Sequence, residues 1–107
     1  MKGGKTLIMD TLYFGFSRNT SAVTKSEWDC FLWDVVTPRF PGGFTYWKAN
    51  GQWKDIVGLV YKESSMVLQV IHGSSANNAI QEIIDLYKEK YCQESVLRVQ
   101  SKVIARF

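Results

Sequence analysis

The apolar and polar positions of the chain alternate with the period of a strand near both of its ends. Residues 10–18 place Leu12, Phe14 and Phe16 on one face, which predicts the first strand. Residues 95–107 alternate over their whole length and predict the last strand. One face of it carries Leu97, Val99, Val103, Ala105 and Phe107, and the other carries Arg98, Gln100, Lys102 and Arg106.

Two segments between these strands have the period of a helix. Thr24 and Glu27 form a capping box before an apolar run, so a helix is expected to begin near Lys25 and to end at Pro38. A second helix is expected after Gly73, with Ser75 as its N-cap. In both segments the apolar residues recur every three or four positions, as in a helix that packs one side on a core. They are Trp28, Phe31, Leu32 and Val35 in the first segment and Ile80, Ile83, Ile84, Tyr87 and Tyr91 in the second.

Residues 44–72 predict a long β-hairpin. Asn50-Gly51 favours a type I′ turn, because these residue types tolerate the positive φ angles that this turn requires. Residues 55–58 have the composition of a second turn, with Asp first and Gly last, and one long strand is expected after them. Ser64 and Ser65 interrupt the apolar pattern of that strand and predict a β-bulge.

The resulting order of elements is β-α-β-β-α-β. Two right-handed crossovers then place both helices on one face of an antiparallel sheet, which predicts an α+β, ferredoxin-like sandwich. We expect residues 10–107 to form this single domain and residues 1–9 to form a flexible arm. The opposite face of the sheet is expected to dock on another copy of the chain, because the hairpin projects beyond so small a domain. Together with hairpin aromatics, that face is predicted to carry Tyr13, Ser17, Arg98, Lys102 and Arg106.

The composition argues against several classes of partner. The chain has 107 residues and a net charge of +3, which falls short of the dense Lys and Arg clustering of nucleic-acid-binding proteins. No apolar run approaches the roughly 18–20 residues of a membrane span. The apolar core of residues 1–9 is too short for a signal peptide. We therefore expect a cytoplasmic protein with neither a membrane nor a nucleic-acid partner.

The residues on which most catalytic sites depend are scarce. His72 is the one histidine, so a metal cluster built on histidine or a Ser-His-Asp triad would rest on it alone, and its place at the end of an apolar strand favours a structural role. The two cysteines do not form a C-x-x-C pair. Gly3-Gly4-Lys5-Thr6 lacks the upstream glycine and the preceding strand of a phosphate-binding loop. We expect no metal site and no cofactor.

Aromatic side chains on the hairpin are the first candidates for ligand binding. Tyr46, Trp47, Trp53 and Tyr61 offer ring faces on which a purine stacks or over which a cation lies. The alternative is that they pack the sheet and an interface between subunits.

Three charged residues beside the aromatic residues are the other candidates. Glu63 projects from the same strand face as Tyr61, and a carboxylate beside a ring is a receptor for an ammonium group. It is otherwise a solvated charge that pairs with a neighbouring lysine. Arg39 lies in a proline-rich connector and either grips a carboxylate or ties the connector to a helix end. Glu94 follows the second predicted helix; it is the alternative acid for a pocket and otherwise caps that helix or pairs with Arg98.

Five short motifs, in the same order, resemble the markers of a bacterial domain family of unknown function. Members of this family are short and often carry a lipoprotein signal. The resemblance implies no activity. This chain has no such signal, which suggests a cytoplasmic or phage-borne relative. The motifs are Leu12-Tyr-Phe-Gly-Phe-Ser-Arg, Glu27-Trp28, Val36-Thr-Pro-Arg-Phe-Pro, Gly51-Gln-Trp53 and Gln93-Glu-Ser-Val-Leu-Arg-Val.

The chain is also similar, in its size, element order and long hairpin, to the phage S-adenosylmethionine (SAM) lyases. These are oligomeric α/β sandwiches with active sites between subunits, and they release methylthioadenosine and homoserine lactone. The likeness implies a homo-oligomer, a trimer rather than a dimer, that binds SAM; the alternative is a non-catalytic module that binds a small ligand or a host factor. Under the lyase hypothesis Glu63 and Tyr46 are catalytic, and the substrate-binding residues are Tyr61, Trp53, Trp47, Arg39 and Ser17.

Overall fold

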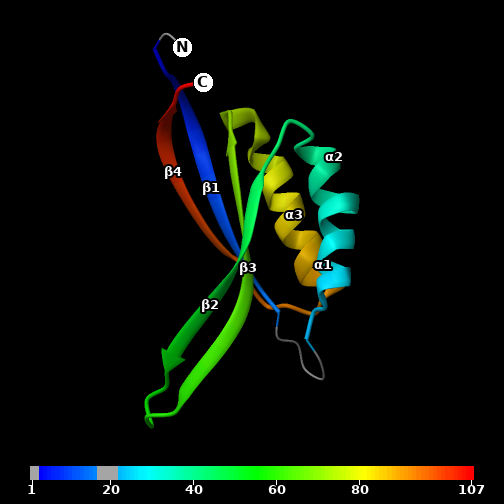
Figure 1. Cartoon of the computed structure of the whole chain (residues 1–107), viewed down its shortest axis with the longest axis vertical. Helices are drawn as coiled ribbons and strands as arrows, with labels where there is room; N and C mark the ends of the chain where they lie inside the picture. Colours follow the sequence, from blue (N-terminus) through cyan, green and yellow to red (C-terminus); the bar gives the residue numbers. More distant parts are fainter. Residues whose placement is uncertain (1–2, 17–21) are drawn as a thin grey trace.

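One antiparallel sheet of four strands forms the centre of the protein. The structure is a computed structural model and describes residues 3–16 and 22–107. The strands are β1 (Lys5–Gly15), β2 (Thr45–Lys54), β3 (Val60–His72) and β4 (Leu97–Ala105). They lie in the order β2-β3-β1-β4, and both helical segments cover the same face (Figure 1). The predicted ferredoxin-like α+β fold is confirmed.

The first helical segment begins where the capping box predicts. In α1 (Lys25–Phe31) the hydroxyl of Thr24 accepts the N–H of Glu27, and the Glu27 carboxylate accepts the N–H of Thr24. The segment continues through a π-helical turn, η1 (Leu32–Val36), and a short helix, α2 (Thr37–Arg39), so the predicted end at Pro38 is wrong by one residue. In the π-helical turn the backbone N–H groups bond to carbonyls five residues earlier, as Thr37 does to Leu32, and not four. Pro38 follows this turn at the start of α2, where its missing N–H is tolerated.

The second helical segment also differs from prediction at its start. A 3₁₀ turn, η2 (Ser74–Ala76), precedes α3 (Asn77–Lys90), and Ser75 does not cap it. The N–H of Ala76 donates to the carbonyl of Gly73 instead, so a backbone hydrogen bond takes the place of the predicted side-chain cap. The predicted buried stripe is confirmed, since Ile80, Ile83, Ile84, Tyr87 and Tyr91 are all buried.

The hairpin turns at residues 55–58 and not at Asn50-Gly51. Asn50 pairs with Ser64 and Gly51 with Glu63, so β2 runs straight through the predicted turn. The carboxylate of Asp55 accepts the N–H groups of Val57 and Leu59, which stabilises the later turn. Turning there adds further cross-strand pairs to the ribbon, and this gain outweighs the local preference of Asn-Gly.

Two further local predictions are wrong. The β2–β3 register continues without interruption through Ser64 and Ser65, so no bulge forms. Residues 5–9 belong to β1 and are not part of a flexible arm. They pair with β4, from Lys5 opposite Ala105 to Met9 opposite Ser101. This pairing keeps the segment extended, although its own alternation of apolar and polar residues is weak.

The face of the sheet away from the helices is apolar, not basic. Directly paired residues of neighbouring strands lie on the same face. Arg98 pairs with Leu12, which is buried under the helices, so Arg98 lies on the helix face, as does Lys102 opposite Ile8. Arg98 is tolerated on that face because it donates to both carboxylate oxygens of the buried Asp10. The open face, as we call the other one, carries Tyr13, Trp47, Ile71, Leu97 and Val99, each 38–60% exposed.

Aromatic rings fill the core between the sheet and the helices. Phe14 contacts Trp28, Phe31 and Tyr87 with ring centroids 4.7–6.1 Å apart. The hydroxyl of Tyr87 donates to the carbonyl of Gly15 at 2.6 Å, at the point where β1 ends. Beyond Gly15, β2 and β3 continue as a two-stranded ribbon that projects from the body (Figure 1). The core therefore fixes the base of the ribbon and leaves its outer half uncovered.

Candidate functional site

Four side chains near the end of the ribbon form one connected group, the ribbon cluster of Trp53, Asp55, Tyr61 and Glu63. Trp53 and Tyr61 are cross-strand partners whose rings stack at 4.5 Å and 17°. The indole N–H of Trp53 donates to Glu63 at 3.0 Å, and the hydroxyl of Tyr61 donates to Asp55 at 3.1 Å. Three of the predicted site residues, Trp53, Tyr61 and Glu63, therefore come together.

The two carboxylates of the ribbon cluster differ in what they bond. The N–H of Leu59, the hydroxyl of Tyr61 and the N–H of Val57 hold the pKa of Asp55 below its ordinary value. Asp55 therefore closes the turn as an anion. Glu63 accepts the N–H of Trp53 and is exposed, so most of its acceptor capacity is available to a ligand.

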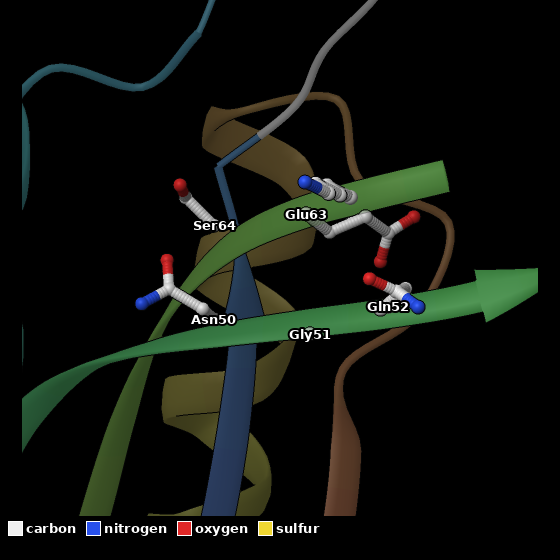
Figure 2. A pocket seen from close by; sticks show the side chains of 6 residues that line it. Asn50, Gly51, Gln52, Glu63 and Ser64 are labelled. Atoms are coloured by element: carbon white, nitrogen blue, oxygen red, sulfur yellow. The ribbon is translucent and has the colours of Figure 1, made fainter. Parts of the chain in front are cut away.

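A cavity of about 420 Å³ lies beside Glu63 where the ribbon leaves the body. Figure 2 shows Asn50 and Ser64 side by side on the two strands, with Glu63 and Gln52 extending farther toward the tip. A second cavity, of about 440 Å³, reaches Glu63 from the open face and is lined by Tyr13, Gln93 and Leu97 among others. Glu63 therefore lines both cavities.

Tyr46 lies in a different place. It lines a cavity of about 460 Å³ under the base of the ribbon, which we call the base cavity. Tyr46 is five residue pairs from Glu63 along the ribbon, about 17 Å at the usual rise of a strand. It also faces the helices, whereas Glu63 belongs to the open face. One copy of the chain therefore does not bring Tyr46 and Glu63 to the same small ligand.

The remaining predicted site residues are also dispersed. Trp47 lies on the open face, in a row across all four strands with Val67, Tyr13 and Leu97. Arg39 donates to the carbonyl of Val35 at 2.9 Å and pairs with Glu82 of α3 at 3.4 Å, so it ties the end of α2 to α3. Ser17 lies outside the described residues.

The most highly bonded polar group is one that the sequence did not single out. Asp10 is fully buried and accepts Nε of Arg98 at 2.8 Å, Nε2 of His72 at 2.5 Å and the amide of Gln100 at 3.3 Å. Nδ1 of His72 lies 2.6 Å from the carbonyl of Gly73, so both ring nitrogens lie within hydrogen-bond distance of an oxygen. A lone aspartate amid the apolar pattern of β1 was the available signal. The structural role predicted for His72 agrees with this geometry.

Burial by itself raises the pKa of Asp10. Hydrogen bonds from Arg98, His72 and Gln100, together with the charge of Arg98, outweigh burial and hold the pKa of Asp10 below its ordinary value. We call Asp10, His72, Arg98 and Gln100 the buried charge cluster. Its donors and acceptors are matched to one another, and it joins β1, β3 and β4.

Within residues 3–16 and 22–107, no three His, Cys, Asp or Glu side chains are grouped as a metal site would require. Over the same residues, none of the helices has the length and apolar character needed to cross a lipid bilayer.

Comparison with models of protein families places the chain in one family. A family model described as a protein of unknown function (DUF3574) matches residues 9–107. The chain belongs to the DUF3574 family. This confirms the family of unknown function that the five motifs indicated. No curated protein matches the sequence.

Two solved structures resemble this DUF3574 protein in fold. A phage SAM lyase in the apo state is 13% identical with a TM-score of 0.66, over 94% of this chain and 86% of that one. A phage SAM lyase in complex with S-methyl-5′-thioadenosine is 14% identical with a TM-score of 0.65, over 98% of this chain and 95% of that one. At this identity the likeness establishes the shared fold alone.

The side chains of the ribbon in this DUF3574 protein are better suited to binding a cation than to forming a covalent bond with a substrate. An exposed carboxylate beside a stacked indole and phenol attracts a positively charged group by its charge and by the ring faces. Such a group gains most when a further surface excludes water from the site. The open face and the uncovered ribbon leave room for that surface.

Proposed function

We propose that this protein is a SAM lyase that forms methylthioadenosine and homoserine lactone. In this reaction a carboxylate oxygen of the substrate attacks its own γ-carbon, the carbon–sulfur bond breaks, and its electron pair goes to the sulfonium sulfur. The protein needs only to hold the substrate folded in a dry site. The observation that carries the proposal is the exposed Glu63 carboxylate bonded to the Trp53–Tyr61 stack, on a fold similar to that of phage SAM lyases.

The residues take the following roles in this proposal. Glu63 binds the ammonium group of the methionine moiety. The outer ring faces of Trp53 and Tyr61 lie beside the sulfonium of the bound substrate, because an aromatic ring attracts its positive charge. Tyr46 orients the substrate from the base cavity. Trp47 serves the site indirectly, as part of the open face.

The proposed site is completed by a second copy of the chain. About 17 Å and opposite sheet faces separate Tyr46 from Glu63 within one chain, so a small substrate meets both only if they come from neighbouring copies. The apolar row of Trp47, Tyr13 and Leu97 on the open face is a surface that a homo-oligomer buries. We propose a cyclic trimer, in which each ribbon reaches the body of the next subunit.

The direct test incubates the purified protein with SAM and measures methylthioadenosine and homoserine lactone by mass spectrometry. We expect both products in equal amounts. Glu63→Gln removes a charged hydrogen bond to the ammonium and is expected to lower kcat/KM about 10–100-fold. Glu94→Gln is the matched control and should leave it unchanged. Absence of product at high enzyme concentration contradicts the proposal, and equal effects of the two substitutions contradict the role of Glu63.

A binding module without catalysis is the second candidate, and the tip of the ribbon favours it. Ile56, Val57, Leu59 and Val60 are each at least 51% exposed there, a group of aliphatic side chains that suits contact with another protein. In that case ligands raise Tm without turnover. Stabilisation by SAM with no product formed, together with loss of partner binding in Val57→Asp, would favour this candidate over the lyase.

A further inference from the structure

The base cavity lies between the ribbon and the start of α1. It has a volume of about 460 Å³, which is within the usual range for a small-molecule site. Its walls are mostly apolar and aromatic, and they come from elements that the core fixes in place. The main contributors are Phe16, Val23, Trp28, Tyr46 and Met66.

One of the residues that line the base cavity, Trp28, carries an unpaired hydrogen-bond donor. Nε1 of Trp28 is buried and has no acceptor among the described residues. The ring itself is fixed, because it packs against Phe14, Phe16 and Phe31 with centroids 5.3–6.0 Å apart. Buried indole N–H groups normally have a partner, so an acceptor brought to Nε1 makes a bond that the free protein lacks, once a side chain that covers Nε1 moves aside.

Charged groups are confined to the rim of the cavity. Lys25 and Asp29 pair with each other at 2.7 Å, and the Asp29 side chain remains 48% exposed. Lys48 makes no ion pair within the described part of the chain. The rim therefore offers a carboxylate and an ammonium to hydroxyl groups, while the interior offers ring faces to a flat apolar group.

We propose that the base cavity binds a purine nucleoside, with the base between the aromatic walls and the ribose at the rim. A purine presents a flat ring, which matches the aromatic walls, and nitrogen acceptors along its edge, one of which would bond to Nε1 of Trp28 once that atom is uncovered. The ribose hydroxyls suit Asp29 and Lys48. The inference rests on the proposed function, since it places the nucleoside half of SAM beside Tyr46 and away from Glu63 of the same chain.

The test measures binding of methylthioadenosine and adenosine by calorimetry, with homoserine as a probe that has no ring. We expect both nucleosides to bind and homoserine alone not to bind. Ala22→Phe adds a ring at the cavity wall and should weaken nucleoside binding at least tenfold, whereas the matched variant Val57→Phe, at the exposed tip, should not change it.

The outcomes separate this inference from the lyase proposal. Nucleoside binding that is lost in Ala22→Phe, without turnover of SAM, supports the cavity and refutes the lyase. Turnover with unchanged KM and unchanged nucleoside affinity in Ala22→Phe refutes the cavity and leaves the lyase standing. Failure of either nucleoside to bind the unmodified protein also overturns the inference.

Trp28→Phe examines the hydrogen bond separately. The substitution removes the unpaired N–H and keeps an aromatic wall. We expect weaker binding of methylthioadenosine, by about tenfold, with homoserine still unbound. Unchanged affinity in a variant whose circular dichroism matches that of the unmodified protein would show that this N–H is not part of the site.

Discussion

The protein holds two carboxylates in opposite situations, Asp10 in the body and Glu63 on the ribbon. Asp10 is fully buried and accepts bonds from three side chains on two other strands. Glu63 is exposed and accepts one bond from a neighbouring indole. A buried charge is tolerated only when its partners satisfy it, whereas an exposed one can keep acceptor capacity unused. The comparison assigns Asp10 to stability and leaves Glu63 as the carboxylate that we propose binds a ligand.

The largest expected effect is the loss of the charge at Asp10. Asp10→Asn leaves the largely buried guanidinium of Arg98 without its counter-ion, and breaking such a pair typically costs about 3–5 kcal/mol. The free energy of unfolding, measured in urea, should fall by that amount. For a domain of this size Tm should fall by about 12 °C or more. A loss below about 1 kcal/mol would mean that the buried charge cluster does not stabilise the fold.

Low pH should lower the free energy of unfolding through protonation of the same residue, Asp10. The pKa of Asp10 in the folded protein lies below its ordinary value of 3.8, so the unfolded chain takes up the proton first as the pH falls. The stability that Asp10 contributes is present above its unfolded pKa and is lost as the pH drops through the folded pKa. Urea unfolding between pH 6 and pH 2 should show this loss. Asp10→Asn should lack that part of the pH dependence, and an identical acid profile in both proteins would contradict the assignment.

A moderate gain is expected at Gly51 on the ribbon. Gly51 lies inside β2 without a positive φ angle, and an added Cβ meets only the carbonyl of Glu63 at an ordinary 3.9 Å. Gly51→Thr should raise the free energy of unfolding by about 0.5–1 kcal/mol, because threonine suits a strand and costs less backbone entropy than glycine. Thermal unfolding measures this change. Destabilisation would mean that the ribbon turns at Asn50-Gly51 after all.

The smallest effect on stability is expected at Glu63. Glu63→Gln keeps an acceptor for the indole of Trp53 and buries no unpaired charge, so the free energy of unfolding should change by less than about 0.5 kcal/mol. The same urea titration used for Asp10→Asn provides the comparison. A loss as large as that of Asp10→Asn would make Glu63 a structural residue and remove the contrast between the two regions.

The sequence predicted the fold well because its evidence was local and repeated. The alternation around Leu12 and Phe14, and the stripe of Ile80, Ile83 and Tyr87, identify core positions whatever their partners are. The turn at Asp55 was also visible, since its side chain closes its own loop. These features depend on neighbours along the chain.

The predictions failed where pairing between strands distant in the sequence determines the local structure. Asn50-Gly51 is a strong turn signal in isolation, yet pairing with Ser64 and Glu63 keeps it extended. Arg98 was placed on the wrong face because its partner Asp10 lies 88 residues away. Within the candidate site, alternation put Tyr61 and Glu63 on one face, but the separation of Tyr46 from Glu63 depends on the true position of the turn.

Complementation between inactive variants tests the shared site most directly. Glu63→Gln and Tyr46→Ala are each prepared alone, then unfolded together and refolded as a mixture, and methylthioadenosine production from SAM is measured. Each variant alone should keep no more than about a tenth of the unmodified activity. Random assembly places an intact Glu63 beside an intact Tyr46 of the next copy in about one quarter of the interfaces, so the mixture should recover about a quarter of the unmodified activity. A mixture no more active than its components would contradict the account.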